Sequence, residues 1–196
     1  MLAANIKKII TKVVLCLSIF GLNHSVFAND SLQTQSFMIG VSATFPADWT
    51  FLESWDPSDL SIEIAPRKED SPAFALIYPP NPVLPEESLV SYMNDMAHLM
   101  MTHDHDSVLV RVGEYQIGGK TGYETVYTAS DFEGTPTVNA FYGLIADGFF
   151  FVITTSIPVS DVERIQPLMS DLIRSFSYDV EELTSGKSAL MRANGY

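Results

Sequence analysis

The apolar pattern near the end of the chain predicts a buried strand followed by a helix that packs on it. Residues 149–153 are five consecutive apolar residues, aromatic or β-branched, between Gly148 and Pro158. Such a run is typical of a strand with both faces covered. The helix is predicted where apolar residues recur at helical spacing, at Val162, Ile165, Leu168, Met169, Leu172, Ile173 and Phe176. Ser160 and Glu163 have the spacing of a capping box at its start.

Period-two alternation predicts the other strands. The first is expected at residues 37–45, where every second residue is apolar and its neighbours are smaller or polar. Others are expected at residues 50–54, 60–65 and 73–78. Two hairpins follow. In one, a strand at residues 107–117 is joined by the glycine-rich stretch 118–122 to an antiparallel strand at 123–127. In the other, residues 138–145 return over 149–155 after Asp147 and Gly148, a tight-turn signal.

A further helix is predicted to begin near Pro85, because proline suits a first turn and the acids that follow favour the helix dipole. Its apolar stripe comprises Leu89, Tyr92, Met93, Met96, Leu99 and Met100. Pro167 is expected to bend the last helix. Together these elements predict an α+β fold, with an antiparallel sheet of about six to eight strands flanked by helices in an α-β-α sandwich.

The first 28 residues have the pattern of a secretory signal peptide. Three lysines precede the apolar run of residues 13–22, and residues 26–28 end it with small-residue cleavage spacing. The run is shorter than the roughly 20 residues of a spanning helix. The only cysteine, Cys16, follows Leu15 rather than the small residue that a lipoprotein signal requires. We therefore expect export through a cleaved signal peptide, to the periplasm or as a secreted protein.

The remaining chain is expected to form one domain without disulfides. We expect a polar lead-in at residues 29–36, a single domain at 37–183 and a flexible tail at 184–196. The net charge of the whole chain is −13, and removal of the lysine-bearing signal makes it more acidic. This charge repels phosphate backbones and anionic lipids. Nucleic acid is excluded as a partner, and no membrane insertion is expected after signal cleavage.

Five features in a fixed order carry a resemblance to a known family. They are residues 45–49 after a first strand, the long helix after a middle strand, residues 117–119 at a hairpin, residues 149–154, and residues 173–176 at the end of the last helix. This order resembles the PsbP/Mog1-like superfamily, which includes bacterial DcrB-like and DUF1795 proteins. The resemblance covers most of residues 37–176. It implies an antiparallel sheet between helices and a role in protein binding or assembly, with no catalytic set and no cofactor. Members serve unlike partners, so the partner stays open.

The richest cluster of potential metal ligands lies in residues 93–106. Thioether with imidazole suits copper, and imidazole with carboxylate suits zinc. Met93, Met96 and Met100 share the apolar stripe of Leu89, which predicts that they pack in the core. His98 is nine positions past Leu89 and is expected on the solvent side of the helix. His103 and His105 therefore remain as the candidate ligands, and a periplasmic copper or zinc binding protein is the alternative function.

The sequence assembles no catalytic constellation. Gly119, Lys120 and Thr121 have the order of a phosphate loop, but Glu114 stands where that loop needs glycine, and a strand is predicted to follow. There is no Gly-x-Ser-x-Gly motif, and the chain after the signal has no cysteine.

Other side chains that invite a functional reading are expected to be structural. Acidic pairs such as Glu181 and Glu182 are expected to be solvated. Trp49 and Trp55 flank a turn and are expected to pack under the sheet edge rather than form a binding wall. The sequence thus predicts an exported, non-enzymatic module that acts through protein contacts.

Overall fold

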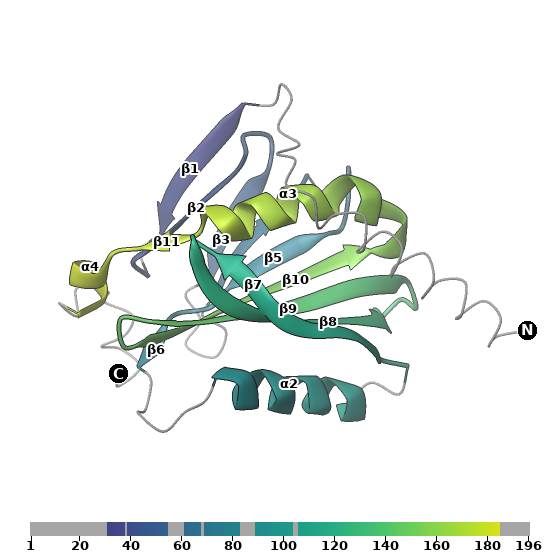
Figure 1. The fold of residues 1–196 in the computed structure, drawn as a ribbon. Helices are drawn as coiled ribbons and strands as arrows, with labels where there is room; N and C mark the ends of the chain where they lie inside the picture. Colours follow the sequence, from purple (N-terminus) through teal and green to yellow (C-terminus); the bar gives the residue numbers. More distant parts are fainter. Residues whose placement is uncertain are drawn as a thin grey trace, which may run out of the picture.

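The computed structural model describes residues 31–37, 39–54, 61–67, 69–82, 89–103 and 106–184, except for the side chains of residues 82, 97 and 100–103. The predicted signal peptide and most of the predicted tail lie outside these ranges. The elements, shown in Figure 1, are β1 (Leu32–Phe37), β2 (Val41–Pro46), β3 (Thr50–Ser54), β4 (Ser61–Ala65), β5 (Phe74–Ile77), β6 (Asn81–Pro82), α2 (Leu89–His103), β7 (Val108–Ile117), β8 (Lys120–Ser130), β9 (Pro136–Ala146), β10 (Phe149–Pro158), η1 (Val159–Asp161), α3 (Val162–Ser175), β11 (Ser177–Tyr178) and α4 (Val180–Thr184).

The main sheet is antiparallel, with the strand order β3-β4-β5-β10-β9-β8-β7, and β6 pairs with β10 beside this path. Both predicted hairpins are present. Asp147 and Gly148 have φ of 52° and 82°, as the tight turn between β9 and β10 requires. The other turn is shorter than expected, because β8 already begins at Lys120. The predicted antiparallel sheet is confirmed.

A second, three-stranded sheet has the order β1-β2-β11 and corrects two predictions. The strand expected at residues 37–45 is instead a hairpin, because Gly40 has φ of 74° and its N–H donates to the Phe37 carbonyl at 3.0 Å. Ile39 in the turn is 5% exposed. The apolar alternation therefore continues through the turn, and the sequence pattern does not reveal the reversal of the chain. Residues 32–36, expected in the lead-in, lie in β1.

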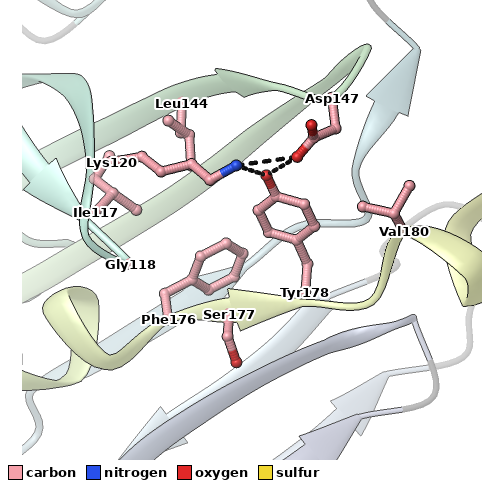
Figure 2. Close-up of a pocket in the computed structure, with 9 residues that line it drawn as sticks. All are labelled: Ile117, Gly118, Lys120, Leu144, Asp147, Phe176, Ser177, Tyr178 and Val180. Atoms are coloured by element: carbon pink, nitrogen blue, oxygen red, sulfur yellow. Dashed lines mark hydrogen bonds and ion pairs between the residues drawn. The ribbon is translucent and has the colours of Figure 1, made fainter.

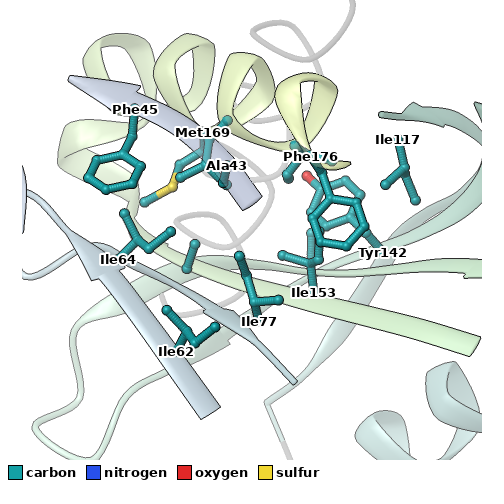
Figure 3. Close-up of a cluster of buried hydrophobic side chains, with 14 of the residues drawn as sticks. Ala43, Phe45, Ile62, Ile64, Ile77, Ile117, Tyr142, Ile153, Met169 and Phe176 are labelled. Carbon is teal, nitrogen blue, oxygen red and sulfur yellow. The ribbon is translucent and has the colours of Figure 1, made fainter. Parts of the chain in front are cut away.

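Helix α3 packs against β2 of the small sheet and against β10 and β7 of the main sheet. Its inner side is fully buried at Ile165, Met169 and Leu172. Figure 3 shows Met169 among side chains of both sheets, including Phe45 and Ile64. Helix α2 lies on the opposite face of the main sheet, below β8 in Figure 1, and packs mainly against β7, β8 and β9. The predicted α-β-α arrangement is confirmed.

The start of α3 corrects the predicted capping box. A 3₁₀ turn, η1, precedes the helix, and the N-cap is Asp161, without a side-chain cap hydrogen bond. The Asp161 carboxylate is engaged elsewhere, since Ser71 Oγ donates to it at 2.5 Å and Arg164 lies 3.7 Å away. The helix continues across Pro167 to Ser175. The predicted start of α2 near Pro85 lies outside the described residues.

Candidate functional site

Three polar side chains meet at the surface between two hairpin turns and β11 (Figure 2). Lys120 Nζ lies 3.0 Å from Asp147 Oδ2 and donates to Tyr178 Oη at 2.6 Å. Tyr178 Oη donates to Asp147 Oδ2 at 2.5 Å. Lys120 begins β8, Asp147 lies in the β9–β10 turn, and Tyr178 lies in β11. We call these three residues the polar clamp.

The protonation states of the polar clamp favour a structural role over acid–base chemistry. Hydrogen bonds with Tyr178 and Asp147 raise the pKa of Lys120. Hydrogen bonds from Tyr178 and Lys120 lower the pKa of Asp147. Burial, and then the hydrogen bond to Asp147, raises the pKa of Tyr178. A lysine nucleophile needs a depressed pKa. The clamp therefore holds an ammonium, a carboxylate and a neutral phenol together.

The depression beside the polar clamp has a volume of about 240 Å³ and apolar walls from Ile117, Leu144, Phe176 and Val180. The Tyr178 ring stacks on Phe151 with a centroid distance of 4.4 Å. Pockets for small molecules usually enclose about 300–1,000 Å³. The depression is thus smaller than a typical substrate site, and the clamp fastens the segment after α3 to the main sheet.

The sequence did not predict the polar clamp. Tyr178 lies 58 positions from Lys120 and 31 from Asp147, and no motif links the three. The glycine-rich turn identified the place of Lys120, and the Asp-Gly pair that of Asp147. Only the pairing of β11 with β2 brings Tyr178 to them. The sequence thus indicated where Lys120 and Asp147 lie, but not that Tyr178 meets them.

A second polar contact lies on the face of the main sheet that α3 covers. Glu124 is 4% exposed, and its Oε1 lies 2.7 Å from Arg111 Nη2. Burial raises the pKa of Glu124, and the charge of Arg111 opposes that rise. Glu124 has Gly113 and Tyr142 as its register neighbours on β7 and β9. A buried carboxylate with one exposed cationic partner makes stability depend on pH.

We expect the Glu124 carboxyl to lower stability as pH rises. Its folded-state pKa lies above the unfolded value of about 4.3, so the folded state binds the proton more tightly. Folding is therefore favoured at low pH and loses this contribution as pH rises through the folded-state pKa. Urea unfolding of wild type and Glu124→Gln from pH 3.5 to 8 measures this. The wild-type free energy of unfolding, relative to the variant, should fall with pH and then level off. A difference that is constant or rises with pH would contradict it.

The predicted metal site is only partly visible. His105 and the side chain of His103 lie outside the described residues, so their role stays a prediction. Met93 is 1% exposed and packs against the sheet, which confirms its expected place in the core. A Cβ atom on Gly143 would lie 2.8 Å from Met93 Sδ, so this glycine permits the close approach of α2. His98 is exposed, as expected. The described part of the chain contains no group of three or more His, Cys, Asp or Glu placed to hold a metal ion.

Two further expectations concern apolar segments. Trp49 is 6% exposed and belongs to the core, as predicted, whereas Trp55 lies outside the described residues. Within the ranges that the structure describes, no helix has both the length and the apolar character required to span a bilayer.

Part of the main sheet, on the face that carries α2, presents apolar side chains beyond the reach of that helix. On β4, β5 and β10, alternate residues such as Ile64, Ile77 and Ile153 are buried toward α3, so their neighbours face the other way. In register, Leu52 lies opposite Glu63, and Glu63 opposite Leu76. We call this surface the open face, and it comprises Leu52, Glu63, Phe74, Leu76, Tyr78, Val152 and Thr154.

The open face is apolar and accessible. Leu52 is 66% exposed, and Phe74, Leu76, Tyr78 and Val152 are half-buried. The only charge among its residues is Glu63, which is exposed. A group of partly exposed apolar side chains on a monomer often marks a protein interface. The open face is thus the surface of the described structure that best suits a protein contact.

Solved structures share this architecture. Cyanobacterial PsbP (CyanoP) from Synechocystis sp. PCC 6803 matches with a TM-score of 0.55 and 14% identity, over 81% of this chain and 98% of its own. The Ran-binding protein Mog1p of Saccharomyces cerevisiae matches with a TM-score of 0.52 and 9% identity, over 76% of this chain and 96% of its own. LpqN, involved in cell envelope biogenesis of Mycobacterium tuberculosis, matches with a TM-score of 0.51 and 11% identity, over 78% of this chain and 86% of its own. No protein-family model and no curated protein matches the sequence.

The strand order, the two helix layers and the small sheet together define an α+β protein built on an antiparallel sheet. The matches to PsbP and Mog1p then specify the fold: the chain has the PsbP/Mog1-like fold. This confirms the fold that the resemblance implied.

Proposed function

We propose that the protein is an exported, non-enzymatic module that binds or helps to assemble another protein, and that the open face is its contact surface. The observation that carries the proposal is the open face itself. Five of its seven residues are apolar and at least partly accessible, from Leu52 on β3 to Val152 on β10. Burial of apolar side chains is the dominant favourable contribution to most protein–protein association.

The chemistry of the described residues supports binding rather than catalysis. The polar clamp keeps Lys120 charged and Tyr178 protonated, and the depression beside it is small. The solved structures of the same fold include a protein described as Ran-binding and one involved in cell envelope biogenesis. Export is proposed from the signal-peptide pattern of residues 1–28, with the periplasm or the medium as destination.

Replacing Leu52 with aspartate is expected to reduce partner recovery by about tenfold. The change puts a charge on the most exposed apolar residue of the open face, where it would have to be desolvated on binding. The measurement is a pull-down by the tagged mature domain from the envelope fraction of its source cells, at low and moderate salt. Quantitative mass spectrometry compares wild type with Leu52→Asp.

Phe132→Asp provides the matched control, because Phe132 is fully exposed in the β8–β9 turn, outside the open face. It should recover the same protein as wild type. A partner lost equally from both variants would indicate nonspecific apolar or charge effects. Recovery of no protein above a charge-matched control would oppose the proposed function.

A further inference from the structure

Among the described residues, three long strands, β1, β3 and β7, lie at edges of the two sheets, and β1 differs from the other two. Natural sheets protect their free edges with charged residues, prolines or bulges. Strand β7 carries the charged Arg111 and Glu114, and its register shifts between Leu109 and Arg111. Strand β3 carries Glu53. Strand β1, with the sequence Leu-Gln-Thr-Gln-Ser-Phe, has no charge and no proline. Among the described strands, β1 is thus the edge best suited to accept another strand.

The backbone of β1 is turned outward at alternate residues. Thr44 on β2 donates its N–H to Ser175 Oγ at 2.8 Å and accepts from the same hydroxyl at 3.1 Å, so it points away from β1. Thr34 is its register partner. Thr34 and Thr44 therefore form a non-hydrogen-bonded pair. In such a pair of antiparallel strands, both residues point their backbone N–H and C=O groups away from each other. The N–H groups of Leu32, Thr34 and Ser36 therefore face the open edge, and their side chains are exposed.

Acidic residues lie near both ends of β1. Asp48 lies at one end of β1, because Ala47 N–H bonds to the Ser31 carbonyl. At the other end, Asp179 N–H bonds to the Gly40 carbonyl, and Glu182 packs beside Gly40. An added strand would meet negative charge at both ends.

Two basic side chains of the described residues, Arg174 and Lys120, are engaged elsewhere. Arg174, next to Ser175, lies 3.7 Å from Asp171 and over the Tyr115 ring. Lys120 belongs to the polar clamp. The acidic residues near the ends of β1 favour a cationic ligand at this edge.

We propose that the open edge of β1 binds an extended, lysine- or arginine-bearing segment of a partner protein by strand addition. The backbone of the segment pairs with Leu32, Thr34 and Ser36, and its basic side chains lie near Asp48 and Asp179. Strand addition takes affinity from main-chain hydrogen bonds and specificity from side chains. The inference deepens the proposed function, since it adds a second contact surface, separate from the open face, and states the chemistry of the segment bound there.

The probe is a fluorescein-labelled peptide of alternating lysine and valine, and the readout is fluorescence anisotropy with the mature domain. We expect saturable binding that weakens with salt, and no binding of the matching glutamate–valine peptide. Thr34→Pro should weaken binding by about tenfold, since it removes one outward N–H. Proline is tolerated there because that N–H does not bond to β2. Thr34→Ala keeps the N–H and should bind as wild type.

N-methylated probes separate strand addition from simple charge attraction. N-methyl groups on one alternate set of residues block one edge of the peptide, and those on the other set leave that edge intact. Blocking both edges together should abolish binding, which charge attraction alone would survive. Leu52→Asp, on the open face, should leave probe binding unchanged, so failure of the open face and failure of the β1 edge are distinguishable.

Several outcomes would overturn the inference. Probe binding unaffected by Thr34→Pro and by double N-methylation would place the peptide elsewhere. Equal affinity for the acidic peptide would remove the charge argument. Dimers that dissociate in Thr34→Pro, together with no probe binding, would make a second copy of the chain the occupant. Far-ultraviolet circular dichroism of each variant verifies that the fold is intact, and a second proline variant at Ser36 repeats the test if Thr34→Pro does not fold.

Discussion

Replacing Phe176 with alanine is expected to lower the free energy of unfolding by about 3–5 kcal/mol. Phe176 is 2% exposed, and its ring meets Phe151 edge-to-face at 5.5 Å and forms a wall of the depression beside the polar clamp. Truncation leaves a cavity between α3 and the main sheet that the backbone of α3 cannot fill. Urea unfolding followed by circular dichroism measures the loss.

The control for this substitution is Phe132→Ala. The two changes remove the same atoms, but Phe132 is fully exposed, so its loss should alter stability by less than about 0.5 kcal/mol. If Phe176→Ala lowers the free energy of unfolding by less than about 1 kcal/mol, the surrounding side chains close around the missing ring and the prediction is wrong.

Replacing Gly118 with alanine is expected to destabilise the protein by at least about 1–2 kcal/mol more than the same change at Gly119. Both residues have positive φ, 56° and 74°, so both variants carry the strain of a left-handed alanine, about 1–2 kcal/mol. A Cβ on Gly118 would lie 2.1 Å from the Phe176 carbonyl oxygen, whereas one on Gly119 would meet nothing within 4 Å.

The difference between the two variants isolates the close approach of the β7–β8 turn to the end of α3. Unfolding curves of both variants, recorded under the same conditions, give this difference directly. Equal losses would show that the turn moves away from Phe176 at little cost, and that the hydrogen bond from Gly118 N–H to the Ile173 carbonyl does not hold it.

Local pattern was sufficient for most of the main sheet and for α3. Alternation of Ile62 and Ile64 with Glu63 indicated which residues of β4 are buried, and the structure places them so. Helical spacing identified the buried side of α3 from Val162 to Ile173. These predictions succeed because burial of one face imposes a period on the sequence, whatever the partner element is.

Features set by distant contacts were not readable in the same way. The β1–β2 hairpin was missed because Ile39 is buried within the turn, so the alternation does not mark the reversal. The polar clamp depends on where Tyr178 lies after α3. Strand β1, with alternating polar residues, has little apolar pattern of its own, and its pairing with β2 makes it a strand. The positions of the candidate surfaces therefore follow from tertiary structure alone.

The small sheet joins β2 to β11, and Thr44 bonds to Ser175 across 131 positions of sequence. During synthesis, the amino-terminal hairpin must wait for nearly the whole domain to emerge before its third strand exists. Such distant pairing slows folding. A nascent chain halted after β10 would lack both α3 and β11, so the core side chains of β2, among them Phe45, would lack the cover of α3.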